Sequence, residues 1–100
     1  MGAEQALKVY VEVFAVFDEE GRMLPRWITW EDGQRYRIDR VGEVKQAAAM
    51  RCGGQGDRFT VYIGGRPSYL YFERSARPTG NRLGKWFVER KVAAEGRTKG

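Results

Sequence analysis

Apolar and polar residues alternate with a period of two along much of this chain, and that spacing predicts β-strands. The first alternating stretch is residues 7–17, in which β-branched side chains are frequent. One face of this predicted strand carries Val9, Val11, Val13 and Phe17. The opposite face carries Tyr10, Glu12, Phe14 and Val16. Because this second face is also largely apolar, we expect it to be partly covered.

A first turn is predicted at residues 18–21, an Asp-Glu-Glu-Gly stretch that cannot continue a buried strand. Gly21 supplies the positive φ that a hairpin loop needs. Pairing Asp18 with Arg22 predicts three cross-strand pairs: Phe17 with Met23, Val13 with Trp27, and Val11 with Thr29. Pro25 has no N–H for the ladder, so we expect it at an edge or a bulge.

The Asp32-Gly33 dipeptide predicts a second hairpin with a two-residue loop. The predicted pairs are Trp30 with Arg35, Thr29 with Tyr36, Ile28 with Arg37, Trp27 with Ile38, and Arg26 with Asp39. The two turns then agree on one core face, which holds Val11, Val13, Phe17, Met23, Trp27, Tyr36 and Ile38. The other face holds an Arg26–Asp39 ion pair and Ile28, Trp30, Arg35 and Arg37. There we favour a cation–π contact of Trp30 with the two arginines over a ligand cage.

The Gly64-Gly65 dipeptide predicts a third hairpin, formed by residues 58–63 and 66–73. With Ile63 opposite Arg66, its core face holds Phe59, Val61, Leu70 and Phe72. Its outer face holds Arg58, Thr60, Tyr62, Pro67, Tyr69 and Tyr71. A basic loop is predicted at residues 75–84 and a last strand at 85–92. That strand places Trp86, Val88 and Arg90 on one face and Phe87 and Glu89 on the other.

The segment between the second and third hairpins gives a weaker pattern. Gly42 indicates a bulge or a bend. Residues 44–51 have a helix-friendly composition but no helix start signal, so we favour an extended segment, with one helical turn as the alternative. Residues 52–57 predict a loop, and residues 93–100 predict a disordered tail.

These elements amount to about six short antiparallel strands joined by turn-rich connections. A single open sheet of this size would leave one apolar face bare. The sequence therefore predicts an all-β fold curled into a small SH3-like or OB-like barrel, a two-layer sandwich being the alternative. A chain of 100 residues fits one domain, which we place at residues 7–92 after a flexible N-terminus at residues 1–6.

Charge is distributed unevenly along the chain, which has a net charge of +5. Residues 1–50 carry 7 basic and 9 acidic side chains, whereas residues 51–100 carry 11 basic and 4 acidic ones. A basic half favours anionic partners, although a cationic surface without such a role is equally compatible with it. No apolar run is long enough to span a bilayer and no signal peptide is evident, so we expect a cytoplasmic protein without membrane contact.

Four stretches resemble a family of short, uncharacterised bacterial proteins: residues 30–41 (WEDGQRYRIDRV), 53–61 (GGQGDRFTV), 69–73 (YLYFE) and 85–89 (KWFVE). The resemblance covers most of residues 8–91, and residues 75–84 look like an insertion relative to it. It implies a small all-β domain of unknown function and carries over no catalytic residue.

The residue types for catalysis are scarce. The chain has no His, which removes the commonest general base and any His-containing zinc site. Cys52 is the single cysteine, and residues 53–56 lack the Gly-Lys-Ser/Thr ending of a phosphate loop. We therefore expect no catalytic residue, no metal, no cofactor and no enzymatic activity.

The outer face of the third hairpin is the predicted binding surface for nucleic acid. It combines tyrosines that could stack bases with arginines that could hold the backbone: Arg58, Tyr62, Tyr69, Tyr71, Arg74, Arg77 and Arg82. Packing of these tyrosines beneath a terminal strand is the competing explanation. An interface with another protein, or with a second copy in a homo-oligomer, is the other alternative, and Tyr10, Phe14 and Val16 suit it.

Overall fold

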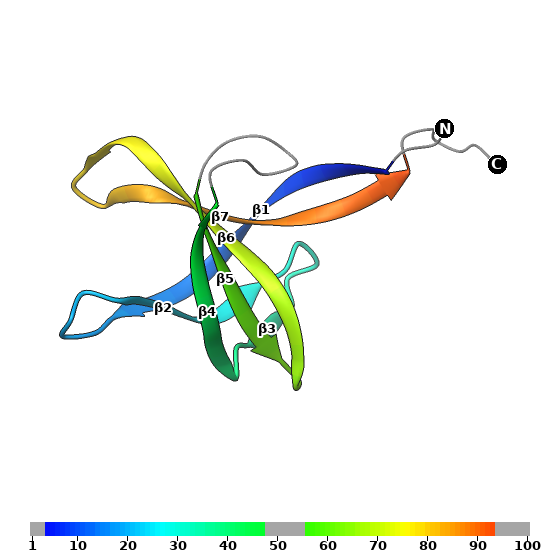
Figure 1. The fold of residues 1–100 in the computed structure, drawn as a ribbon, viewed down its shortest axis with the longest axis horizontal. Helices are drawn as coiled ribbons and strands as arrows, with labels where there is room; N and C mark the ends of the chain where they lie inside the picture. The colour runs from blue at the N-terminus through cyan, green and yellow to red at the C-terminus, as the bar shows by residue number, and fades with distance from the viewer. Residues whose placement is uncertain (1–3, 48–55, 94–100) are drawn as a thin grey trace.

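The computed structural model describes residues 4–47 and 56–93, which form seven strands and the turns between them. The strands are β1 (Glu4–Phe17), β2 (Met23–Thr29), β3 (Arg35–Arg37), β4 (Arg40–Ala47), β5 (Gly56–Ile63), β6 (Arg66–Thr79) and β7 (Arg82–Ala93). All pairings are antiparallel, and the strands lie in the order β3-β2-β1-β7-β6-β5-β4. The sheet curls strongly into an open half-barrel (Figure 1). The predicted all-β antiparallel class is confirmed.

The curl brings the two ends of the sheet together at the link between β3 and β4. The Ile38 amide donates to the carbonyl of Arg26 on β2 at 2.8 Å, and the Asp39 amide donates to the carbonyl of Tyr62 on β5 at 2.7 Å. Ile38 is 4% exposed, so this link also supplies a core side chain. Two residues thus bridge the half-barrel at one end.

β1 is shared between two neighbours. Its first part, from Glu4 to Val11, pairs with β7, and its second part, from Glu12 to Phe17, pairs with β2. The strand begins three residues before the predicted start at Leu7. In Figure 1 the start of β1 and the end of β7 run side by side, while the β1–β2 and β6–β7 hairpins project away from them.

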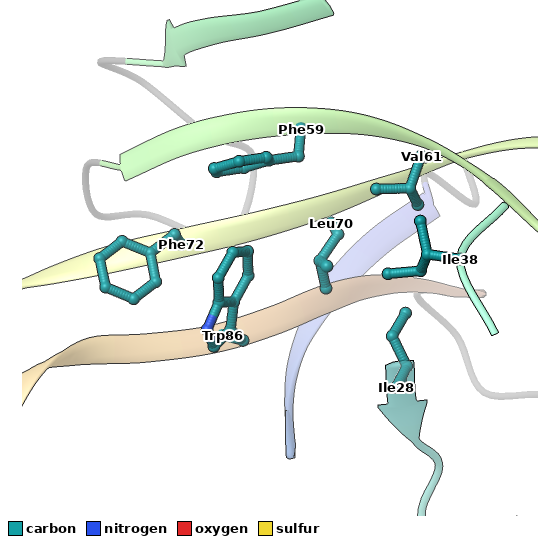
Figure 2. Packing of buried hydrophobic residues seen from close by; sticks show 7 residues of the cluster. All are labelled: Ile28, Ile38, Phe59, Val61, Leu70, Phe72 and Trp86. Atoms are coloured by element: carbon teal, nitrogen blue, oxygen red, sulfur yellow. The ribbon is translucent and has the colours of Figure 1, made fainter. Parts of the chain in front are cut away.

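The core lies on the concave face of the sheet. Seven buried side chains form one cluster there (Figure 2): Ile28, Ile38, Phe59, Val61, Leu70, Phe72 and Trp86. Half-buried side chains pack around it: Val11, Val13, Ala15, Met23, Trp30, Val41, Ile63 and Val88. Because six of the seven strands contribute to this set, burying it fixes the curl of the sheet.

The β5–β6 hairpin has the predicted register. Ile63 lies opposite Arg66, and Gly64 and Gly65 have φ values of 60° and 80°. The alternation of inward and outward side chains along both strands also agrees with the prediction.

The hairpin between β2 and β3 differs from the prediction by one residue. The Trp30 amide donates to the carbonyl of Gln34 at 2.8 Å, so the loop holds three residues and Gly33, at φ 86°, closes it. Ile28 therefore pairs with Tyr36 and points into the core, and Trp27 pairs with Arg37. The prediction that Trp27 and Tyr36 lie in the core was wrong, and each is 40% exposed.

The hairpin between β1 and β2 starts in the predicted register and then shifts. Phe17 pairs with Met23 as predicted, but a bulge follows in which Ala15 pairs with Pro25 and Phe14 with Trp27. The placement of Pro25 at a bulge is confirmed, whereas the predicted Val13–Trp27 and Val11–Thr29 pairs are wrong. Phe17 is 60% exposed instead of buried because β7 flanks β1 only as far as Val11, so the hairpin end projects beyond the core.

Three further predictions need correction or limits. Residues 75–84 are not a loop, because β6 and β7 continue into them and turn between Thr79 and Arg82. Asp39 does not pair with Arg26 across a ladder, since its carboxylate accepts a hydrogen bond from the Gly65 amide at 3.2 Å. Of the tail predicted at residues 93–100, Ala93 belongs to β7 and the rest lies outside the described residues. Residues 48–51 of the predicted extended segment and residues 52–55 of the predicted loop lie outside them as well.

The segment before that gap is extended, as predicted. β4 spans Arg40–Ala47, and its register against β5 shifts between Val41 and Val44. The bulge that Gly42 indicated is therefore confirmed. Gly56 and Asp57, predicted as the end of a loop, belong to β5.

Candidate nucleic-acid interface

Two tyrosine–arginine pairs lie on the outer face of β4, β5 and β6. The guanidinium of Arg40 lies 3.8 Å from the ring centre of Tyr62, and that of Arg58 lies 4.4 Å from the ring centre of Tyr69. Arg40 pairs with Tyr62 across β4 and β5, which explains the first contact. We call these four residues, Arg40, Arg58, Tyr62 and Tyr69, the tyrosine surface.

The pairs differ in how firmly they are held. Arg58 is half-buried, and its Nε is buried without a hydrogen-bond partner among the described residues. Tyr69 is 50% exposed beside it. Tyr62 is half-buried and lies against Gly42, where an added Cβ would stand 3.2 Å from the tyrosine Cε1. The glycine at the β4 bulge therefore makes room for that ring.

Tyr71 has a different environment from its neighbour Tyr69. Its ring stacks on Phe87 of β7 at 5.0 Å between centres with an interplanar angle of 7°, and only 7% of the residue is exposed. Its hydroxyl donates to a carboxylate oxygen of Glu89 at 3.3 Å. A base cannot reach this ring, so Tyr71 acts as a packing residue of the outer face.

The three remaining predicted arginines lie apart from the tyrosine surface. Arg74 donates to the Asp57 carboxylate at 2.8 Å. Arg77 and Arg82 are exposed near the turn of the β6–β7 hairpin. The structure therefore does not gather the seven predicted binding residues into one patch.

A groove lies on the outer face where β1, β6 and β7 meet. Its volume is about 590 Å³, and its lining residues are Tyr10, Glu73, Arg74, Ser75, Ala76, Asn81, Arg82, Gly84 and Lys85. We call it the charged groove. Sequence reasoning missed Glu73 and Lys85 as members, because they become neighbours only through the β6–β7 register.

Glu73 is the electrostatic centre of the charged groove. The Tyr10 hydroxyl donates to one carboxylate oxygen at 2.7 Å, and the Lys8 ammonium donates to the other at 3.4 Å. The Tyr10 hydrogen bond, with Lys8 and Lys85 nearby, lowers the pKa of Glu73 below its ordinary value. The same hydrogen bond raises the pKa of Tyr10. Glu73 is thus an anion at neutral pH, and Lys85 also lies 4.9 Å from the centre of the Tyr10 ring.

A second groove, of about 410 Å³, lies over β1, β2 and β3. It is lined by Glu12, Val13, Phe14, Trp27, Thr29 and Arg35. Phe14, which is 61% exposed, lies opposite Trp27. Of the residues predicted for a protein interface, Phe14 lines this groove, Val16 is half-buried, and Tyr10 belongs to the charged groove instead.

Trp30 also differs from its prediction. It packs against the core cluster, and the guanidinium of Arg90, not of Arg35 or Arg37, lies 5.9 Å from its ring centre. Arg90 forms an ion pair with Glu31 as well. These contacts fasten the β2–β3 loop to β7.

Other kinds of site have little support in the described part of the chain. No three His, Cys, Asp or Glu side chains there lie close enough together to hold a metal ion. Cys52 lies outside that part. No helix in residues 4–47 or 56–93 has the length and hydrophobicity to cross a bilayer.

Comparisons with known protein families, with characterised proteins and with solved structures give no match for this chain. The bacterial family resemblance described above therefore stays a prediction. Fold and surface together define an all-β protein whose half-barrel carries paired tyrosines and arginines on its outer face.

Proposed function

We propose that this chain is a non-catalytic binding module that holds single-stranded nucleic acid on the tyrosine surface. The observation that carries the proposal is the pairing of two tyrosine rings, the half-buried Tyr62 and the exposed Tyr69, with arginine guanidinium groups on one outer face. Bases stack on both aromatic rings and guanidinium planes, and the guanidinium charge attracts the phosphate backbone. The basic second half of the sequence supports an anionic partner.

A base could bind at the tyrosine surface in either of two stacking arrangements. The guanidinium of Arg58 or Arg40 already covers one side of its tyrosine ring. An incoming base either stacks on the outer side of the guanidinium or takes its place on the ring. In the first arrangement the tyrosine ring holds the guanidinium in place, and in the second the ring itself is the platform, so removing the ring weakens binding in both.

We also propose that the half-barrel belongs with the small SH3-like or OB-like barrels. The strong curl and the hydrogen bonds of Ile38 and Asp39 that bridge the two ends of the sheet support this assignment. An experimental structure with β3 and β4 far apart and without these two bonds would contradict it.

The binding proposal is tested by fluorescence anisotropy with a labelled 12-nucleotide oligothymidylate at 50 mM salt. Loss of one stacked base is worth about 1–3 kcal/mol, so Tyr62→Ala and Tyr69→Ala should each weaken binding by about 5- to 150-fold. Tyr69→Phe keeps the ring and should bind like the unmodified protein. Tyr36→Ala is the matched control, because Tyr36 is similarly exposed but lies on β3, which forms no ladder with β4, β5 or β6.

Two results would overturn the binding proposal. One is absence of binding by the unmodified protein at 50 mM salt. The other is equal weakening by Tyr36→Ala and Tyr69→Ala, with far-UV circular dichroism showing that both variants are folded.

Self-association is a second candidate function, and the exposed Phe14–Trp27 pair favours it. The groove holds both Glu12 and Arg35, so two copies related by a twofold axis could place each acid opposite the other copy's base. Light scattering after size-exclusion chromatography should then give a dimer mass, and Phe14→Glu should give a monomer mass. A monomer mass for the unmodified protein would exclude this function.

A further inference from the structure

Three residues of the charged groove, Tyr10, Glu73 and Lys85, lie on the same face of the sheet as the tyrosine surface. Arg82 lines the groove from the turn of the β6–β7 hairpin. Tyr69, Tyr71 and Glu73 alternate along β6 and therefore point outward together. Four residues of extended strand span about 13 Å. Between the two sites lies the stacked Tyr71–Phe87 pair, which makes an apolar floor.

The charges of the groove favour an anionic group. Glu73 accepts hydrogen bonds from Tyr10 and Lys8, so its charge is engaged within the protein. Arg74 is engaged by Asp57. Lys85 adds a second cation beside the one carboxylate. Arg82 is exposed and makes no ion pair with any other described residue. The groove therefore has excess positive charge at Arg82 and Lys85.

Neutral donors lie next to these cations. Asn81 and Ser75 line the same groove and offer an amide and a hydroxyl. Phosphate oxygens accept hydrogen bonds from such groups as well as from Arg and Lys. The charged groove therefore offers both the charged and the neutral donors that contact a phosphate backbone.

We infer that the charged groove binds the phosphodiester backbone of the strand whose bases stack on the tyrosine surface, with Arg82 and Lys85 as the phosphate contacts. This inference rests on the proposed function. A stacked strand rises about 3.4 Å per nucleotide, so about four nucleotides cover the 13 Å between Tyr69 and Glu73. The two sites together place the bound strand along β6, from Tyr69 towards Glu73.

The test measures how the affinity for the 12-nucleotide strand depends on salt between 50 and 200 mM. Each phosphate contact on a single strand contributes about 0.7 to the slope of log K against log salt concentration. Arg82→Ala and Lys85→Ala should each lower the slope by about 0.7 and weaken binding about eightfold at 50 mM salt. Arg22→Ala removes one exposed charge at the turn of the β1–β2 hairpin, which belongs to neither the charged groove nor the tyrosine surface, and should leave the slope unchanged.

The tyrosine variants separate the two proposals. Tyr62→Ala and Tyr69→Ala should reduce affinity at every salt concentration without changing the slope, because they remove no charge. If the unmodified protein binds and the tyrosine variants weaken it, but Arg82→Ala and Lys85→Ala leave the slope unchanged, the groove inference is overturned and the proposed function stands. If the unmodified protein does not bind, the proposed function fails and the inference fails with it.

Discussion

Replacing Ile28 by alanine tests the register of the β2–β3 hairpin directly. With a two-residue loop Ile28 would face solvent, whereas with the observed three-residue loop it is 5% exposed within the core cluster. Ile→Ala removes three carbon groups, worth about 0.8 kcal/mol each in transfer free energy, and leaves a cavity that adds to the loss. We therefore expect Ile28→Ala to lower the free energy of unfolding by about 3 kcal/mol.

Urea denaturation followed by far-UV circular dichroism measures this loss. In thermal unfolding the same change should lower Tm by roughly 12–24 °C for a domain of this size. Val44→Ala is the control, because Val44 is 49% exposed on the edge strand β4 and should lose only about 0.8 kcal/mol. A loss below about 1 kcal/mol for Ile28→Ala, equal to that of the control, would refute the one-residue shift in register.

The remaining predictions concern the outer face and one close backbone contact. Gly84→Ala should destabilise the protein by at least 1–3 kcal/mol in urea denaturation, because the new Cβ would stand 2.4 Å from the Glu73 carbonyl oxygen; unchanged stability would contradict this contact. Phe87→Ala should cost about 3–5 kcal/mol although Phe87 lies on the outer face, since it is 0% exposed beneath Tyr71; a loss below 1 kcal/mol would show that the outer cluster is open to water. Tyr10→Phe should destabilise most between the ordinary pKa values of Glu73, 4.5, and Tyr10, 10.0. Because the pKa of Glu73 is lowered, the hydrogen bond contributes to the free energy of unfolding above pH 4.5. This contribution is lost as the pH falls through the pKa of Glu73 in the folded protein. Because the pKa of Tyr10 is raised, the same hydrogen bond contributes to the free energy of unfolding below pH 10.0. This contribution is lost as the pH rises through the pKa of Tyr10 in the folded protein. Urea denaturation of the unmodified protein and of Tyr10→Phe should therefore show a difference in free energy of unfolding that becomes smaller at low and at high pH. A difference that does not change with pH would exclude the Tyr10–Glu73 hydrogen bond.

The sequence predicted some hairpins better than others because turn signals differ in how tightly they set loop length. Gly64-Gly65 is flanked directly by alternating residues, and the predicted register holds. Asp32-Gly33 fits a two-residue loop and also a three-residue loop closed by glycine. The structure has the longer loop, in which the Asp32 carboxylate accepts a hydrogen bond from the Gln34 amide at 2.9 Å. The choice between the two loops depends on burying Ile28, which no local signal reports.

The candidate site was predictable only in part, for a related reason. Tyr69 and Tyr71 have the same outward position on β6, and nothing in the local pattern distinguishes them. The two rings differ in exposure because Phe87 of β7 stacks on Tyr71, whereas the β6–β7 ladder does not extend to Tyr69. Pro78 and Gly80 also made residues 75–84 look like a loop, which hid the β6–β7 register. The contacts of β7 with β6 thus decided which predicted side chains stay accessible.

The position of β7 in the centre of the sheet has a consequence for the order of assembly. Every other ladder among the described strands joins neighbours in sequence, whereas the β1–β7 ladder joins Glu4 to Ala93. During synthesis from the N-terminus, the part of β1 from Glu4 to Val11 therefore has no ladder partner until β7 has emerged. The sheet therefore becomes continuous in one late step, when strands β1 to β3 and strands β4 to β7 join through the β1–β7 ladder.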